Sequence, residues 1–246
     1  MELRRSLSTA PPPYMEGALD NPALGIDEAV ELLRNRAATS GVLVRIGRAR
    51  ALTRAYAVKR GLVRHARTPP SLARAFLPQL YWKDLAEIAD DPKAQAALRH
   101  HAEEMLAHRL TDLSLGEKVA LARRASPRVI SALRTSRDAA ILKAVLSNPR
   151  LLERDAVSVA ADPEAPREAL THLATHTAWG SRYPVRICLV GNPRTPIAAA
   201  LRLLQGLPAR DLERIANDEA VPRIVRVRAE RSLSEAPGAR RVARGG

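Results

Sequence analysis

Residues 56–106 read YAVKRGLVRHARTPPSLARAFLPQLYWKDLAEIADDPKAQAALRHHAEEML, and residues 183–233 repeat them as YPVRICLVGNPRTPIAAALRLLQGLPARDLERIANDEAVPRIVRVRAERSL. The two copies align without a gap, and about a third of the aligned positions are identical. Self-similarity at a constant offset is the signature of a protein built from repeated structural units. We therefore expect the two copies to fold alike.

The positions that are identical in the two copies are those expected to begin a helix or to lie on its buried side. Thr68 and Thr195 are predicted N-caps, with Pro69 and Pro196 at the first helical position, where a missing N–H costs nothing. The apolar residues of 72–80 then recur at helical spacing. Each copy is thus predicted to contain three helices.

Residues further along each copy indicate where the first helix ends and where the next two helices begin. Pro78 ends or kinks the first helix of the first copy, because proline cannot continue a helical hydrogen-bond ladder. Asp84 and Asp211 are expected to cap a second, short helix that buries Leu85 or Leu212. Pro92 and Pro222 are expected to open the third helix.

The region between the copies has the same character. Ser114-Leu115-Gly116-Glu117 has the form of a capping box at the start of a helix. Asn-Pro-Arg occurs at 148–150 and again at 192–194, and asparagine before proline indicates a turn. An apolar run precedes each of the two.

An apolar helix, then Asn-Pro-Arg-Thr-Pro, then a short leucine-rich helix resembles the leucine-rich-repeat-variant class of bacterial helical repeats. It is similar, more loosely, to HEAT-like α-solenoids. The likeness covers residues 56–233, with residues 148–150 and 192–196 carrying the closest match. It implies an all-α, right-handed α-solenoid of short helices with an extended binding surface. Some members carry an iron–sulfur cluster on N-terminal cysteines, which this chain lacks, so no cofactor is expected.

The amino-acid composition agrees with the all-α prediction and indicates the kind of partner that the protein binds. Aromatic residues are only 3% of the chain, so alanine, leucine, valine and isoleucine must supply the core, as suits closely packed helices. The net charge of +14 favours an anionic partner, which could be nucleic acid, an acidic protein surface or anionic lipid. Arginine richness without a functional cause is the alternative explanation.

Cellular location and domain bounds are also predicted. Cys188, the only cysteine, is expected to be a small buried residue, and no apolar run reaches the length of a membrane span. The protein is therefore expected in the cytoplasm. Residues 1–24 are predicted to be a flexible arm, 25–233 a single helical-repeat domain, and 234–246 a disordered basic tail.

One window of the sequence is strongly basic. Twelve arginine and lysine residues lie between Glu31 and Asp84, with no acidic residue among them. A cationic face of this kind binds phosphates or an acidic protein, although it is also found as a merely solvated surface. The residues predicted to form the binding face are Arg45, Arg48, Arg60, Arg64 and Arg67.

The two tryptophans, Trp82 and Trp179, are possible aromatic contacts for a base or a partner protein, with packing between repeats as the alternative. Trp82 beside Asp84 also raises an enzyme hypothesis. One family of bacterial DNA glycosylases has HEAT-like repeats and uses tryptophan, aspartate and basic residues. Asp84 recurs as Asp211, however, which favours a structural role.

No catalytic or metal site is predicted. His172 and His176 have the i, i+4 spacing of metal ligands, but no third ligand is suggested near them. The glycine patterns of nucleotide-binding loops and the Gly-x-Ser-x-Gly motif are also missing. The sequence therefore favours a non-catalytic scaffold or adaptor that binds an acidic protein or nucleic acid, with a DNA glycosylase-type enzyme as the alternative.

Overall fold

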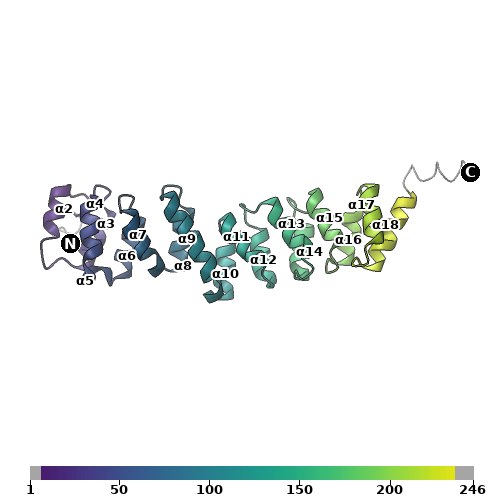
Figure 1. Cartoon of the computed structure of the whole chain (residues 1–246), viewed down its shortest axis with the longest axis horizontal. Coiled ribbons are helices and arrows are strands. Elements are labelled where there is room, and N and C mark those ends of the chain that lie inside the picture. The colour runs from purple at the N-terminus through teal and green to yellow at the C-terminus, as the bar shows by residue number, and fades with distance from the viewer. Residues whose placement is uncertain (1–6, 236–246) are drawn as a thin grey trace, which may run out of the picture. The chain divides into compact units, whose positions relative to one another are not determined.

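The computed structural model describes residues 7–235, and these form helices, turns and loops without any strand (Figure 1). The predicted all-α class is confirmed. No helix in this part of the chain is long and apolar enough to cross a bilayer. The chain divides into two compact units, residues 1–112 and 113–246.

The first unit consists of short helices that pack in pairs. Within it, α3 and α4 pack against α6, α6 and α9 pack against α7, and α8 packs against α9. The elements are α2 (Pro12–Ala18), α3 (Ile26–Arg34), α4 (Ser40–Arg48), α5 (Arg50–Thr53), α6 (Tyr56–Arg64), α7 (Pro70–Phe76), the 3₁₀ helix η1 (Leu77–Gln79), α8 (Trp82–Asp90), α9 (Ala96–His108) and the 3₁₀ helix η2 (Arg109–Asp112).

The predicted flexible arm is, from residue 7 onward, part of the core of this unit. Leu7, Ala10 and Met15 are buried, and the amide of Asn35 donates to the carbonyls of Leu7 and Ala10 at 3.1 and 2.9 Å. The proline cluster starts α2 instead of preventing it, since a proline at the first helical position leaves no hydrogen bond unmade. Residues 1–6 lie outside the described part.

The second unit continues the pattern of short helices. Each of α10, α12 and α14 packs against the next even-numbered helix, α16 packs against α18, and α13 packs against α15. The helices are α10 (Leu115–Ala122), α11 (Pro127–Leu133), α12 (Ala139–Leu146), α13 (Glu153–Ala161), α14 (Arg167–Thr175), α15 (Tyr183–Gly191), α16 (Ile197–Leu204), α17 (Ala209–Asn217) and α18 (Arg223–Glu235).

Two of the sequence predictions concern the first and the last helix of the second unit. The capping box is confirmed: the N–H of Glu117 donates to Ser114 Oγ at 3.4 Å, and the N–H of Ser114 donates to Glu117 Oε2 at 2.9 Å. At the other end, α18 includes the first two residues of the predicted tail. The rest of that tail, residues 236–246, lies outside the described part of the chain.

The two sequence copies have equivalent helices. Tyr56 and Tyr183 begin α6 and α15, and the helices that follow, α7 to α9 and α16 to α18, begin at equivalent positions. Each copy therefore holds four α-helices where three helices had been predicted, because the run before the Thr-Pro step is helical as well. Leu85 and Leu212 occupy equivalent buried positions, as predicted.

Asparagine side chains hold several of the turns between helices. Asn148 Nδ2 donates to the carbonyls of Ala122 and Ala125 at 2.7 and 3.1 Å, while its Oδ1 accepts the N–H of Arg150 at 2.8 Å. Asn192 makes the equivalent three bonds, and Asn35 makes them in the first unit. A buried amide that donates two bonds and accepts one fixes one turn against the preceding one.

The predicted threonine caps are wrong. Helices α7 and α16 begin one residue later than expected, with Pro69 and Pro196 at the N-cap positions. Both prolines are extended, which carries the threonine before each of them away from the first free N–H groups of the helix. Thr68 and Thr195 are instead 3% and 4% exposed, and neither hydroxyl has a hydrogen-bond partner among the described residues.

Three further predictions concern single residues. Pro78 does end its helix, because α7 stops at Phe76 and η1 follows. Pro92 does not open α9; it lies in a turn in which Asp91 Oδ1 accepts the N–H of Lys93 at 2.9 Å. Cys188 is only partly buried, since the core-facing side of α15 is formed by its neighbours Val185, Leu189 and Val190.

Candidate functional site: a basic groove in the first unit

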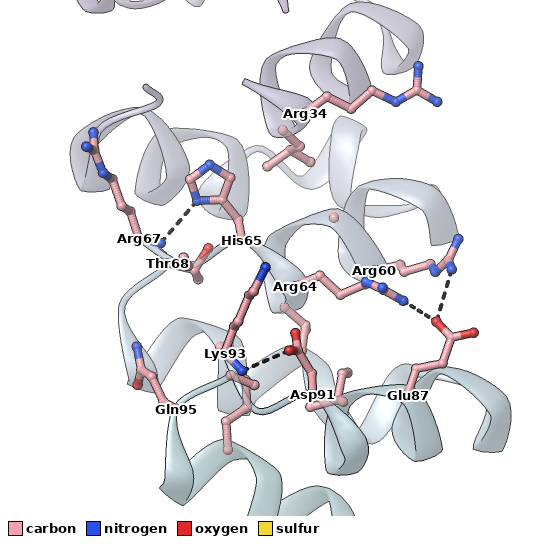
Figure 2. Close-up of a pocket in the computed structure, with 18 of the residues that line it drawn as sticks. Arg34, Arg60, Arg64, His65, Arg67, Thr68, Glu87, Asp91, Lys93 and Gln95 are labelled. Atoms are coloured by element: carbon pink, nitrogen blue, oxygen red, sulfur yellow. Dashed lines mark hydrogen bonds and ion pairs between the residues drawn. The ribbon is translucent and has the colours of Figure 1, made fainter. Parts of the chain in front are cut away.

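A groove of about 690 Å³ lies among α3, α6, α8 and the start of α9 in the first unit (Figure 2). Its floor is aliphatic, with Leu33, Val63 and Ile88 buried beneath it. Its rim is mainly cationic. The charged residues that line it are Arg34, Arg36, Arg60, Arg64, Arg67 and Lys93, together with Glu87 and Asp91.

The turns that follow α3, α6 and α8 form one end of this groove. Each turn is closed by a side chain, of Asn35, His65 or Asp91, that accepts the backbone N–H two residues further on. His65 Nδ1 accepts the N–H of Arg67 at 3.2 Å, and its Nε2 lies 3.0 Å from the Asn35 carbonyl. Because a carbonyl can only accept, the proton of His65 is on Nε2.

Three of the lining arginines have carboxylate partners. Arg60 Nε lies 2.5 Å from Asp84 Oδ1, and its Nη2 lies 3.5 Å from Glu87 Oε2. Arg64 also pairs with Glu87, and Arg34 pairs with Glu31 at 2.6 Å. Although no acid is near Arg60 and Arg64 in sequence, α8 brings two against them, so much of their charge is compensated.

The other three cations have no acidic partner among residues 7–235. Arg36, Arg67 and Lys93 are exposed, and each comes from a different one of the three turns. Arg67 Nη1 donates to the carbonyl of Ala37 at 3.2 Å, which leaves its charge uncompensated. Figure 2 shows the side chain of Lys93 extending toward the turn of His65 and Thr68.

The structure divides the predicted binding face. Arg60, Arg64 and Arg67 line the groove together. Arg45 and Arg48 line a separate depression beside Leu19 and Leu52, where Arg45 pairs with Asp20 at 2.5 Å.

Arg36 and Lys93 belong to the groove and were not among the predicted residues. Arg36 falls within the basic window, but Lys93 follows two acidic residues, and only its place in the third turn brings it to the groove. His65 and Asp91 each follow the last residue of a helix, and a cation comes two residues after each of them, Arg67 or Lys93 respectively. That recurrence is the signal that sequence reasoning could have used.

Asp84, expected to cap α8, is its third residue and binds another helix. Its carboxylate accepts the hydroxyl of Tyr56, and the hydroxyl oxygen of Tyr56 accepts the N–H of Tyr81 at 3.0 Å. Burial, and next the hydrogen bond to Asp84, raise the pKa of Tyr56 to about 12. Asp211 accepts the hydroxyl of Tyr183 in the second copy, so the pair belongs to the repeat.

Neither tryptophan lines the groove. Trp82 is partly buried, with Lys83 Nζ 5.7 Å from its ring centroid. Trp179 is 9% exposed and packs under Arg182, 4.8 Å from the ring centroid. Trp179 is therefore packed against its neighbours, which was the alternative role considered for both tryptophans.

The paired histidines have local partners. His172 Nε2 lies 3.2 Å from Ser147 Oγ, and His176 Nδ1 accepts the N–H of Ala178 at 3.3 Å. Burial, and then the charges of His176 and Lys143, lower the pKa of His172. In the described part of the chain, no three His, Cys, Asp or Glu side chains are grouped so as to hold a metal ion.

Comparisons of the chain with protein-family models, with curated proteins and with solved structures find no match. The function of the groove is therefore inferred from its own charges, burial and shape. These features are a cationic rim that is only partly neutralised and an aliphatic floor.

Proposed function

We propose that this chain is a non-catalytic helical-repeat scaffold whose first unit binds an anionic macromolecule in the basic groove. The observation that carries this proposal is the set of three cations without acidic partners, Arg36, Arg67 and Lys93, around one groove. Three cations without carboxylate partners give this groove an excess of positive charge, and an anionic ligand would compensate it.

The scaffold is proposed to be a right-handed α-solenoid with units of the HEAT-like or leucine-rich-repeat-variant-like kind. Two features support this. Within the second unit, even-numbered helices pack against one another in series, and the helices of the two sequence copies begin at equivalent positions. Proteins of this architecture present extended surfaces that commonly recognise other macromolecules.

Binding is favoured over catalysis by the way the reactive groups are used. Both ring nitrogens of His65 are occupied by backbone groups, and the Asp91 carboxylate accepts a backbone N–H. Asp84, the residue that a glycosylase-type mechanism would use, is buried and bound to Tyr56 and Arg60. The groove thus offers charge and shape, without a nucleophile–base pair.

The test compares two double variants with equal charge change. Arg36→Gln/Lys93→Gln removes two groove cations, and Arg167→Gln/Arg223→Gln removes two exposed cations of the second unit. Binding of fluorescent polyglutamate and oligothymidylate is measured by anisotropy over a range of salt concentrations. The groove variant is expected to weaken binding at least tenfold and to reduce the slope of log K against log salt for oligothymidylate by roughly one to two.

The control variant should keep nearly the full affinity, because its charges lie outside the groove. Circular dichroism of both variants checks that the fold is retained. Equal losses in the two variants would mean that affinity follows net charge alone and would contradict a groove-specific function. Absence of binding to either polyanion by the unmodified chain would contradict it as well.

A further inference from the structure

We infer that the ligand of the groove is an acidic protein segment that also carries aliphatic side chains. This inference depends on the proposed function and specifies the class of partner. It follows from the floor of the groove, from the absence of aromatic platforms in it and from the distribution of its charges.

The floor of the groove offers apolar surface to a ligand. Val30 and Leu98 are partly exposed there, and Ala57 and Ala66 are exposed. Gly61 lets α6 pack closely on α3 beneath this surface, because a Cβ at this position would lie 2.9 Å from Leu33 Cδ1. Aliphatic side chains gain free energy by covering such a surface, whereas phosphates and sugars gain little from it.

The groove lacks the features by which proteins hold nucleic acid in a cleft. Single strands are bound by stacking their bases on aromatic rings. His65 is the only aromatic residue among the described residues that line the groove; Tyr81, Trp82 and Trp179 lie outside it. A volume of about 690 Å³ is within the range of small-ligand pockets and is far too small to admit a duplex. It suits a few residues of an extended peptide.

The charges of the groove specify where acidic residues of the ligand would lie. Arg36, Arg67 and Lys93 belong to the turns at one end, and no carboxylate in the described structure pairs with them. At the other end Glu87 already pairs with Arg60 and Arg64. Acidic side chains of a bound segment therefore match the turns, and its aliphatic side chains match the floor between α3, α6 and α9.

The inference is tested by selecting displayed random dodecapeptides on the full-length chain at physiological salt. Counter-selection on the Arg36→Gln/Lys93→Gln variant removes peptides that bind elsewhere. Enriched peptides are expected to combine aspartate or glutamate with leucine, isoleucine or valine. In anisotropy measurements, the best peptide should bind at least tenfold more tightly than oligothymidylate, and the groove variant should weaken it at least tenfold.

A change in the peptide separates the aliphatic contribution without altering the protein. Replacing the aliphatic residues of the best peptide by serine should reduce its affinity at least tenfold, with the acidic residues kept. Unchanged affinity, or enrichment of peptides without acidic residues, would overturn the inference. Groove-dependent binding of oligothymidylate tighter than that of any selected peptide would also overturn it, while leaving the proposed function intact. If the groove variant affects neither ligand, both proposals fail.

Discussion

The two four-helix segments α6–α9 and α15–α18 have equivalent helices but different surfaces. Both keep the hydrogen bond from a tyrosine hydroxyl to a buried aspartate, at Tyr56–Asp84 and Tyr183–Asp211. Beside this shared pair, the first copy places a network of two arginines and a glutamate. The corresponding residues of the second copy are Ile187, Gly191 and Arg214, which make no such network.

The equivalent residues Arg67 and Arg194 make the same hydrogen bond between turns but differ in whether a carboxylate compensates their charge. Arg67 Nη1 donates to the carbonyl of Ala37 at 3.2 Å, and Arg194 Nη1 donates to the carbonyl of Glu164 at 3.3 Å. Arg194 also pairs with the Glu164 carboxylate at 3.0 Å, whereas alanine offers no such partner to Arg67. Both copies keep the bond between turns, whereas at this position only Arg67 presents a positive charge without a carboxylate partner.

The largest expected effect tests the equivalence of the two cores. Leu85→Ala and Leu212→Ala should each reduce the free energy of unfolding of the affected unit by about 3 kcal/mol, because each removes a buried side chain and leaves a cavity. Urea denaturation followed by circular dichroism measures the change. A loss below about 1 kcal/mol in only one copy would show that the two cores are not equivalent.

A smaller effect should distinguish the two aspartates. Asp84→Ala breaks the hydrogen bond from Tyr56 and the ion pair with Arg60, so we expect a loss of about 2 kcal/mol. Asp211→Ala breaks only the bond from Tyr183, which is more exposed, and should cost about 1 kcal/mol. The same denaturation experiment compares them, and equal losses would assign no stability to the Arg60 pair.

The smallest expected effect is a gain, and it should be the same in both copies. Thr68→Val and Thr195→Val remove a buried hydroxyl without a partner and keep the shape, so each should stabilise the protein by about 1 kcal/mol. Thr39→Val is the matched control. Thr39 does cap α4, accepting the N–H of Val42 at 3.3 Å, and its replacement should cost about 1 kcal/mol. Destabilisation by Thr68→Val would restore the capping role.

Sequence periodicity predicted the helices well because burial along one face recurs every three to four residues. The duplication, the capping box and the buried leucines were all visible in it. The threonine caps were not predicted correctly, because a Thr-Pro step is compatible with a helix that begins at the proline or after it. The packing of Leu7 and Met15 was missed, since the proline cluster between them hid the short helix that buries Met15.

The sequence by itself determined the helical class, the repeat and an excess of positive charge in the first unit. Tertiary structure alone decided which charges are available to a ligand. Ion pairs join residues that are far apart in the chain, so α8 compensates Arg60 and Arg64 while Arg36 and Lys93, on different turns, meet at one groove. The Coulomb energy of two charges depends on the distance between them in space, and the number of residues between them along the chain does not give that distance.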